Sequence, residues 1–250
     1  MQSQMPVLKE PEPKKKGNKK LIAIIVILFL AILSIVFFNS TLSKITEVQI
    51  TGTQFVNGTE VMNAAGLKVG DSFVFSSAEE IENNVKTLNT INKAVVTKHF
   101  PGIIKIAVTE YSVVAFEFDD KGELIALLAS GASIKTNNDR LQIMDKPILT
   151  GWSKNDPYKN ELMKQLSSIN STLLADISEI APIPSVAFPD RILIYTRTKF
   201  EVTTAVSLIR EKVEAMNGVI ETQAPGKLTL LLADTYEPFN REDMENTETE

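Results

Sequence analysis

The sequence predicts a membrane-anchored α+β protein, with one transmembrane helix followed by two mixed domains outside the cytoplasm. Three observations lead to this fold class. An uncharged apolar run spans residues 21–38, short amphipathic helix patterns alternate with strand patterns after it, and glycine or proline turns separate them. The 250 residues suffice for one or two domains of roughly 150 residues each.

Composition excludes several classes of function. The chain has no cysteine and one histidine, His99, so disulfides, thiolate metal sites and cysteine nucleophiles are excluded, and a serine triad would depend on His99. The net charge of −5 argues against general nucleic-acid binding, and no Walker-type phosphate loop occurs. Nothing in the composition points to an enzyme, a cofactor, a metal, a small-molecule substrate or nucleic acid, and we expect none of them.

The run from Leu21 to Phe38 is predicted to be an uncleaved membrane anchor. Eighteen residues at about 1.5 Å each span about 27 Å, close to a hydrocarbon core of roughly 30 Å. A secretory signal has a shorter apolar region, about 7–15 residues, and small residues at a cleavage site, which residues 37–40 do not provide. A buried core helix is the other alternative, but Ser34 is the only polar residue of the run.

Residues 1–20 are predicted to be a disordered cytoplasmic tail. They hold six lysines and two acids, a net charge of +4 against −9 for the rest of the chain. Because positive residues mark the cytoplasmic side of a span, residues 39–250 are expected outside the cytoplasm. Setting this topology is the simplest role of the lysines, and contact with anionic lipid is the alternative.

Residues 44–111 are predicted to form a small α+β domain with two helices on one face of its sheet. Asn57 and Gly66 read as the two caps of the first helix, and the Pro101-Gly102 turn separates the last two strands. The predicted elements are strand 45–50, helix 57–65, a second helix after the capping box Ser76–Glu79, and strands 94–98 and 103–109.

Residues 112–236 are predicted to form a larger mixed domain with a mostly antiparallel sheet. Asp119–Gly122 is a hairpin turn, Asp156 and Pro157 begin one helix, and Gly218 ends another. The predicted strands are 113–118, 124–129, 148–152, 186–188, 191–196, 200–203 and 227–233, and the predicted helices cover 156–173, with Leu162, Leu166, Ile169 and Leu173 on one face, and 205–216. The acidic stretch 237–250 is predicted to be a disordered tail.

The last predicted strand, 227–233, is the candidate contact surface. One face carries Leu228, Leu230 and Leu232, and the other carries Thr229, Leu231 and Ala233. A half-exposed antiparallel strand normally alternates more sharply, so a second cover is expected over the other face. Either the helix over 205–216 or a partner protein provides it, and the residues leave both open.

Four other residue groups have a structural interpretation that outweighs a functional one. The carboxylates of Asp119 and Asp120 fit a turn better than catalysis, and His99 fits an exposed turn. Glu110 fits a strand-end salt partner or cap better than a general base. Trp152 fits the anchor of a small cluster, with an exposed contact as the alternative.

The order of elements behind a single anchor resembles the bacterial division family called FtsQ, or DivIB in Gram-positive bacteria, whose first outer domain is a POTRA domain. Residues 45–52 (ITEVQITG) resemble its opening strand and glycine, and 67–73 (LKVGDSF) resemble its L-x-x-G-x-x-L/F turn. Residues 96–110 resemble V-x-R-x-W-P-x-x-L-x-I-x-V-x-E, and Gly226–Leu230 with Tyr236–Phe239 resembles the Gram-positive strand ending in Y-x-P-Y/F. The departures are Thr53, Lys98, Phe100 and Val113, where asparagine, arginine, tryptophan and proline are usual.

The resemblance implies a non-enzymatic divisome scaffold in the cell membrane, enriched at the septum. It implies binding of the membrane proteins called FtsB and FtsL, or DivIC and FtsL, by strand addition to an open sheet edge, and a role in septal wall synthesis. The expected contact residues are Thr229, Leu231, Ala233, Tyr236 and Phe239. The alternatives are a POTRA-containing secretion or assembly factor, which needs a barrel that the sequence does not show, and a wall hydrolase, which needs a metal set or nucleophile.

Overall fold

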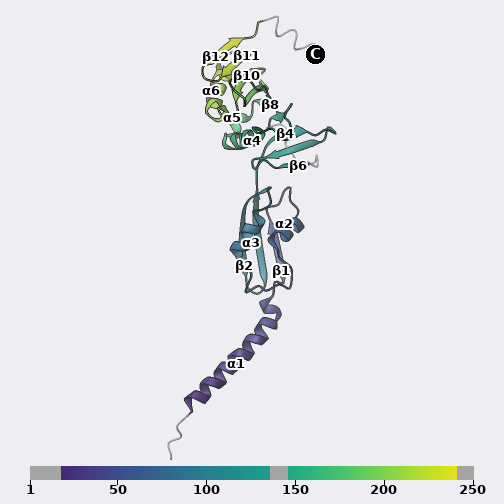
Figure 1. The fold of residues 1–250 in the computed structure, drawn as a ribbon, viewed down its shortest axis with the longest axis vertical. Coiled ribbons are helices and arrows are strands. Elements are labelled where there is room, and N and C mark those ends of the chain that lie inside the picture. Colours follow the sequence, from purple (N-terminus) through teal and green to yellow (C-terminus); the bar gives the residue numbers. More distant parts are fainter. Residues whose placement is uncertain (1–17, 136–145, 241–250) are drawn as a thin grey trace, which may run out of the picture.

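A computed structural model describes residues 18–135 and 146–240. Helix α1 (Lys19–Asn39), a small domain and a larger domain follow one another along the long axis (Figure 1). Among the described residues, α1 is the one helix long and apolar enough to cross a membrane, and no side chain in it is buried. Lys19 and Lys20 belong to this helix, which corrects their assignment to the tail, because lysine is a good helix former and its stem can lie along an apolar surface. The rest of the predicted tail, 1–17, lies outside the described residues.

The first outer domain has the predicted order of strand, helix, helix, strand, strand. Its elements are β1 (Glu47–Thr51), α2 (Gly58–Ala65), α3 (Ala78–Val85), β2 (Ile91–His99) and β3 (Ile103–Glu110). β3 is the central strand, parallel to β1 and antiparallel to β2. Val61 of α2 and Ile81 of α3 are buried in one hydrophobic core with Ile104 and Ile106 of β3, so the two helices cover one face of this sheet.

The predicted caps of α2 are confirmed, whereas that of α3 is displaced by one residue. The Asn57 side chain accepts the Glu60 N–H at 2.8 Å, and Gly66 ends α2 with a φ of 67°. Ser77, not Ser76, caps α3 and accepts the Glu80 N–H at 3.3 Å. The reason is that the Ser76 hydroxyl already donates to the Phe73 carbonyl at 2.9 Å.

As far as the structure describes it, the second outer domain is built on a nine-stranded sheet of order β12-β11-β10-β9-β8-β7-β4-β5-β6. Five of its eight pairings are antiparallel, so the sheet is mostly antiparallel as predicted. The strands are β4 (Val113–Phe118), β5 (Leu124–Leu128), β6 (Ser133–Lys135), β7 (Ile148–Leu149), β8 (Ile177–Pro182), β9 (Arg191–Thr196), β10 (Glu201–Ala205), β11 (Gly226–Leu230) and β12 (Asp234–Pro238).

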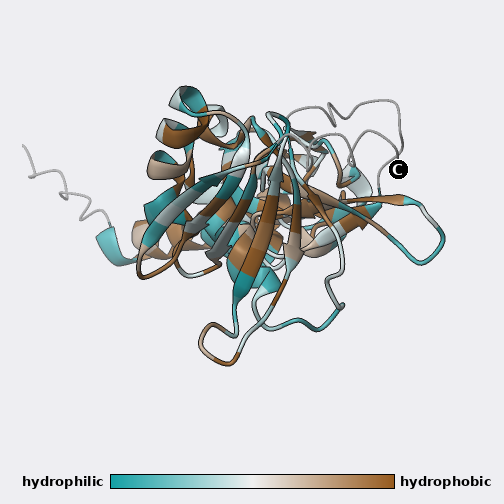
Figure 2. Ribbon diagram, turned by 90° about the horizontal axis from the view of Figure 1, so that it is seen from above, coloured by the Kyte–Doolittle hydropathy of each residue, from teal (hydrophilic) through white to brown (hydrophobic). Residues whose placement is uncertain are grey.

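In the described part of this domain, three helices accompany the sheet: α4 (Lys159–Ser168), α5 (Ser171–Leu174) and α6 (Ile209–Thr222). Leu162 of α4 and Val213 and Met216 of α6 are buried in one core with Ile194 of β9 and Leu228 of β11. The helices therefore pack on the face of the sheet that carries Ile194 and Leu228. Seen from above, strands in the middle of the view are coloured as largely apolar (Figure 2).

The boundary between the two outer domains lies between Tyr111 and Ser112, because the backbone hydrogen bonds of these two residues go to different domains. The Tyr111 N–H donates to the Thr90 carbonyl at 2.8 Å, within the first domain. The Ser112 carbonyl accepts the Ala129 N–H at 3.0 Å, within the second. The two buried cores have no residue in common.

The strand predicted at 186–188 is wrong, and β6, β8 and β12 were not predicted. Residues 185–188 form a turn because the Ser185 hydroxyl accepts the Phe188 N–H at 3.1 Å. β12 extends to Pro238, so the tail does not begin at Glu237; residues 241–250 lie outside the described residues.

Both helix predictions in this domain need correction. Asp156 does not cap α4: its carboxylate accepts the Tyr158 N–H at 2.9 Å, and Tyr158 occupies the cap position. α4 ends at Ser168, which places Leu173 on α5. α6 starts later than predicted because Asp190 holds the preceding turn, its carboxylate accepting the Ser207 N–H at 2.9 Å. Gly218 lies inside α6 rather than ending it.

Candidate partner interface

The predicted contact strand is half of a hairpin. β11 ends at Leu230, the chain turns at 231–233, and β12 returns antiparallel, with Leu230 opposite Asp234 and Gly226 opposite Pro238. Leu231 and Ala233 therefore lie in the turn, and Leu232 is 90% exposed instead of sharing the buried face. The strand pattern fails here because the returning β12 pairs with β11 and places Tyr236 against the core.

The two faces of β11 differ in polarity, which corrects the expectation of two apolar faces. Leu228 and Leu230 are 2% exposed and share the core with α6. The opposite face carries exposed Lys227 and half-buried Thr229. Helix α6 thus covers the leucine face and not the other face, where one of the two predicted alternatives placed it. The other face is polar.

Tyr236 forms a half-buried lid over this end of the core. Its hydroxyl donates to the Ala224 carbonyl at 2.6 Å, and its ring centroid lies 6.5 Å from that of Phe200. A Cβ atom at Gly226 would approach the ring to 2.9 Å and the Glu237 carbonyl to 2.3 Å. Glycine at 226 therefore allows the ring to lie across β11.

Phe239 lies at the end of β12, and alternation places it on the other face from Tyr236. Its N–H donates to the Pro225 carbonyl at 3.1 Å, and the Lys227 Nζ atom lies 6.0 Å from its ring centroid. The two predicted aromatic contacts are therefore at one edge of the sheet but cannot both contact the same surface. Thr229 is one strand further in, opposite Thr235.

β12 is an edge strand, since β11 is its one neighbour in the described part of the sheet. In an antiparallel pair, every second residue directs its backbone N–H and C=O toward the neighbouring strand. Because Phe239 bonds to Pro225 in this way, Thr235 and Glu237 also direct their backbone groups toward β11. Asp234 and Tyr236 direct theirs away from the sheet, and Pro238 has no N–H to offer. The sequence prediction missed this edge, although Thr235, Tyr236 and Glu237 alternate in polarity as a short strand would.

A row of polar side chains crosses the face opposite α6. The strand registers align Glu179, Tyr195, Glu201, Lys227 and Glu237 on five neighbouring strands. Burial raises the pKa of Tyr195 above its usual 10.0, and the charges of Glu201 and Glu179 act in the same direction. This face is thus suited to polar contacts rather than to an apolar partner.

The comparison with known proteins agrees with this architecture. Residues 43–111 match the FtsQ-type POTRA domain. The cell division protein DivIB of Paenibacillus polymyxa is 41% identical over 237 residues, which cover 95% of this chain and 93% of that protein. The chain belongs to the DivIB family. DivIB of Brevibacillus brevis is 30% identical over 241 residues, 95% of this chain and 91% of that protein.

Membership of the DivIB family confirms the resemblance seen in the sequence and the POTRA type of the first outer domain. A solved structure, the major extracytoplasmic domain of the trans isomer of DivIB from Geobacillus stearothermophilus, matches with a TM-score of 0.39 and 24% identity. The match covers 44% of this chain and 92% of that one.

Glu110 acts as a backbone cap in this DivIB-family chain. Its carboxylate accepts the N–H groups of Gln54 at 2.9 Å, Phe55 at 2.9 Å and Val56 at 3.1 Å. The end of β3 is thereby joined to the turn before α2. The interpretation of Glu110 as a strand-end cap is confirmed.

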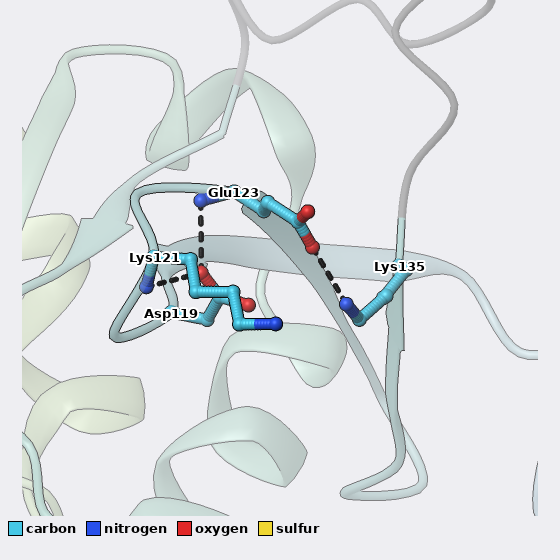
Figure 3. A network of polar contacts seen from close by, with 4 residues as sticks. All are labelled: Asp119, Lys121, Glu123 and Lys135. Atoms are coloured by element: carbon cyan, nitrogen blue, oxygen red, sulfur yellow. Dashed lines mark hydrogen bonds and ion pairs between the residues drawn. The ribbon is translucent and has the colours of Figure 1, made fainter.

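Asp119 stabilises a hairpin turn (Figure 3). Its carboxylate accepts the N–H groups of Lys121 and Glu123, both at 2.9 Å, and these bonds lower its pKa below the usual 3.8. Glu123 in turn pairs with Lys135 of β6 at 2.6 Å. This geometry fits the turn interpretation of Asp119.

The other two candidates also fit their structural interpretations. The Trp152 Nε1–H donates to the Ile180 carbonyl at 3.0 Å, and the ring packs against the core of the second domain. His99 is exposed at the end of β2. Within residues 18–135 and 146–240, no group of three histidine, aspartate or glutamate residues could hold a metal ion.

Proposed function

We propose that this chain is a single-pass scaffold of the divisome. Helix α1 spans the plasma membrane, the lysine-rich N-terminus stays in the cytoplasm, and both outer domains lie outside it. The chain binds FtsL-like and DivIC-like (FtsB-like) membrane division proteins and helps to assemble or regulate septal peptidoglycan synthesis. The role uses no catalytic group or cofactor. Support comes from the apolar helix and from relatives named as cell division proteins.

The open edge of β12 is the observation that carries this proposal. An extended partner segment can add a strand there by bonding to the outward backbone groups of Asp234 and Tyr236. Pro238 and the charged Asp234 and Glu237 oppose indiscriminate edge pairing. The edge therefore favours a partner whose own side chains complement these charges.

The five predicted contact residues take different roles in this arrangement. Tyr236 contributes backbone groups at the edge, and Phe239 offers a half-exposed ring beside them. Leu231 and Ala233 lie in the turn at one end of the edge. Thr229 can be reached only by side chains that lie over the polar face. Leu231→Pro would therefore alter the turn and would not remove an edge N–H.

Cysteine crosslinking tests the edge, because the chain contains no cysteine of its own. Thr235→Cys and Glu237→Cys place thiols at exposed positions of β12. Ser133→Cys and Lys135→Cys do so on β6, the last strand at the opposite side of the sheet among the described residues. Each full-length variant is purified with the FtsL-like and DivIC-like proteins of the same organism. Each partner carries one introduced cysteine at a time, and a short bismaleimide then links it to the cysteine of this chain when the two lie close together.

We expect crosslinks from the β12 positions and none from β6. Circular dichroism of each variant checks that its fold is unchanged. If the complex forms but crosslinks only through β6, the edge assignment is wrong. If no complex forms with the unsubstituted chain, the scaffold proposal itself fails.

A further inference from the structure

The end of α1 is fastened to the first outer domain by buried backbone contacts. A short 3₁₀ turn, η1 (Thr41–Ser43), follows the helix directly. Ser43 is 2% exposed, and its hydroxyl donates to the Phe38 and Ser40 carbonyls, both at 2.9 Å. The Ser43 carbonyl accepts the Phe73 N–H at 2.8 Å. One serine thus bonds the last helical turn to the loop at 67–76.

The next residues of the chain continue this attachment. The Ile45 N–H donates to the Asp71 carbonyl and the Gly70 N–H donates to the Ile45 carbonyl, both at 2.8 Å. The Thr46 N–H donates to the Gly102 carbonyl at 2.8 Å, which places the β2–β3 turn at the same end of the domain. The membrane helix therefore enters the domain through a bonded junction and not through a free linker (Figure 1).

Large apolar side chains are exposed at this end of the domain. Phe75 is 76% exposed, and its ring stacks on Phe38 of α1, with centroids 5.5 Å apart and planes 15° from parallel. Val69 and Phe100 are each 65% exposed, and Val74 is 43% exposed. We call Val69, Val74, Phe75 and Phe100 the basal patch. A gathering of large apolar side chains in water marks an interaction surface.

The position of Phe38 determines which surface the basal patch meets. Phe38 closes the apolar run that begins at Leu21, so a bilayer that covers this run ends near Phe38. Because the Phe75 ring stacks on Phe38, the two rings lie at about the same depth. Two exposed lysines lie close to the patch: Lys68 precedes Val69 in sequence, and Lys44 pairs with Ser72 of the same loop in a β-bridge. Their ammonium groups can reach lipid headgroups while their stems lie on apolar surface.

We propose that the basal patch is a membrane seat, in which the four side chains enter the lipid interface next to α1. Lipid is the occupant because the patch continues the lipid-facing surface of α1 through the Phe38–Phe75 stack. The first outer domain then rests on the bilayer at a fixed orientation. This inference depends on α1 spanning the membrane and not on the proposed partners.

Spin labels on single cysteines measure how deep the basal patch lies in the bilayer. The full-length chain is used, reconstituted in phosphatidylglycerol–phosphatidylethanolamine vesicles. The test positions are Val69, Phe75 and Phe100; Phe29 in the middle of α1 is the membrane control, and Leu232, 90% exposed in the β11–β12 turn, is the water control. Molecular oxygen concentrates in lipid and a nickel chelate stays in water. The ratio of the label's accessibility to the two reagents therefore reports its depth.

We expect the oxygen-to-nickel ratio at the three test positions to lie well above that at Leu232 and below that at Phe29. If Phe29 gives a lipid value while Phe75 and Phe100 match Leu232, the membrane seat is wrong although the anchor is right. If Phe29 itself gives a water value, the anchor fails. Low accessibility to both reagents at Phe75 would show a protein cover and would also overturn the proposal.

A charge substitution gives a second, independent readout. Phe75→Asp should lower the oxygen-to-nickel ratio of a label at Val69, because a carboxylate at Phe75 opposes insertion of the loop. The matched control is Phe118→Asp at the end of β4 in the second outer domain, where the replaced ring is 59% exposed. This change should leave the ratio at Val69 unaltered. Equal ratios in both variants and the parent would overturn the membrane seat.

Discussion

Replacing Tyr236 by phenylalanine and by alanine separates the stability of the β11–β12 hairpin from partner binding. Tyr236→Phe removes one hydrogen bond, from the hydroxyl to the Ala224 carbonyl, and a bond of this kind contributes about 1 kcal/mol net. Tyr236→Ala also removes the ring next to Phe200. Fully buried rings cost about 3–5 kcal/mol when truncated. Because Tyr236 is only half buried, we expect about 2–3 kcal/mol in total.

Hydrogen exchange on the full-length chain in detergent measures the free energy of local opening of β12. The amide protons of Thr235 and Glu237, which face β11, should exchange about fivefold faster in Tyr236→Phe and roughly thirtyfold or more faster in Tyr236→Ala. Tyr195→Phe, on the polar face of β9, is the matched control and should leave both rates unchanged.

Partner affinity should be less sensitive than hydrogen exchange to the loss of the Tyr236 hydroxyl alone. Strand addition uses the backbone of β12, so Tyr236→Phe should bind the FtsL-like and DivIC-like proteins nearly as well as the parent, while Tyr236→Ala should lose about 2 kcal/mol of affinity. That loss should accompany the faster exchange, since it reflects a frayed edge. An unchanged exchange rate together with weakened binding would show that the ring is a direct partner anchor, and the lid interpretation would then be wrong.

Four further outcomes are expected. Glu110→Ala should lower the stability of the first outer domain by about 2–3 kcal/mol in calorimetry, and Glu110→Gln by less, because it keeps one acceptor oxygen for the three N–H groups. The pKa of Asp119 lies below 3.8 in the folded turn, so the stability that its carboxylate contributes is present above pH 3.8 and is lost as the pH falls through the folded pKa. NMR should show the amide signals of Lys121 and Glu123 shifting in that pH range, and these shifts should be absent in Asp119→Asn. A reporter active only outside the cytoplasm should be active when fused after Glu250, and moving Lys14, Lys15, Lys16, Lys19 and Lys20 beyond Phe38 should weaken or invert insertion. Limited proteolysis should yield two protected fragments that meet at Tyr111 and Ser112, whereas one indivisible core from 45 to 233 would contradict this boundary.

The first outer domain was predicted well because its local signals agree with its tertiary contacts. Asn57 and Gly66 are caps both in the sequence pattern and in the fold. Ile104, Ile106 and Val108 alternate along β3 and are all buried. In the second domain the local and distant signals disagree. Gly218 suggests a helix end, but α6 continues through it to Thr222.

The candidate interface shows which information the sequence lacks. Its apolar pattern runs from Leu228 to Ala233 without a glycine, proline or asparagine to mark the turn at 231–233. The turn is set by where β12 must pair so that Tyr236 reaches Ala224 and Phe200. Periodicity could therefore identify an aromatic residue near the edge, but not which strand forms the edge.

The basal patch is likewise formed by contacts between distant parts of the chain that the local sequence pattern does not show. Val69, Phe75 and Phe100 come from two separate turns, and each alone is an ordinary exposed loop residue. Backbone bonds from Ile45 to Asp71 and from Thr46 to Gly102 bring both turns to the end of α1. Both proposed contact surfaces thus depend on backbone pairing between segments that are distant in the sequence. A substitution that disturbs this pairing, such as Gly226→Ala beside Tyr236, should therefore impair the β12 edge although residue 226 contacts no partner.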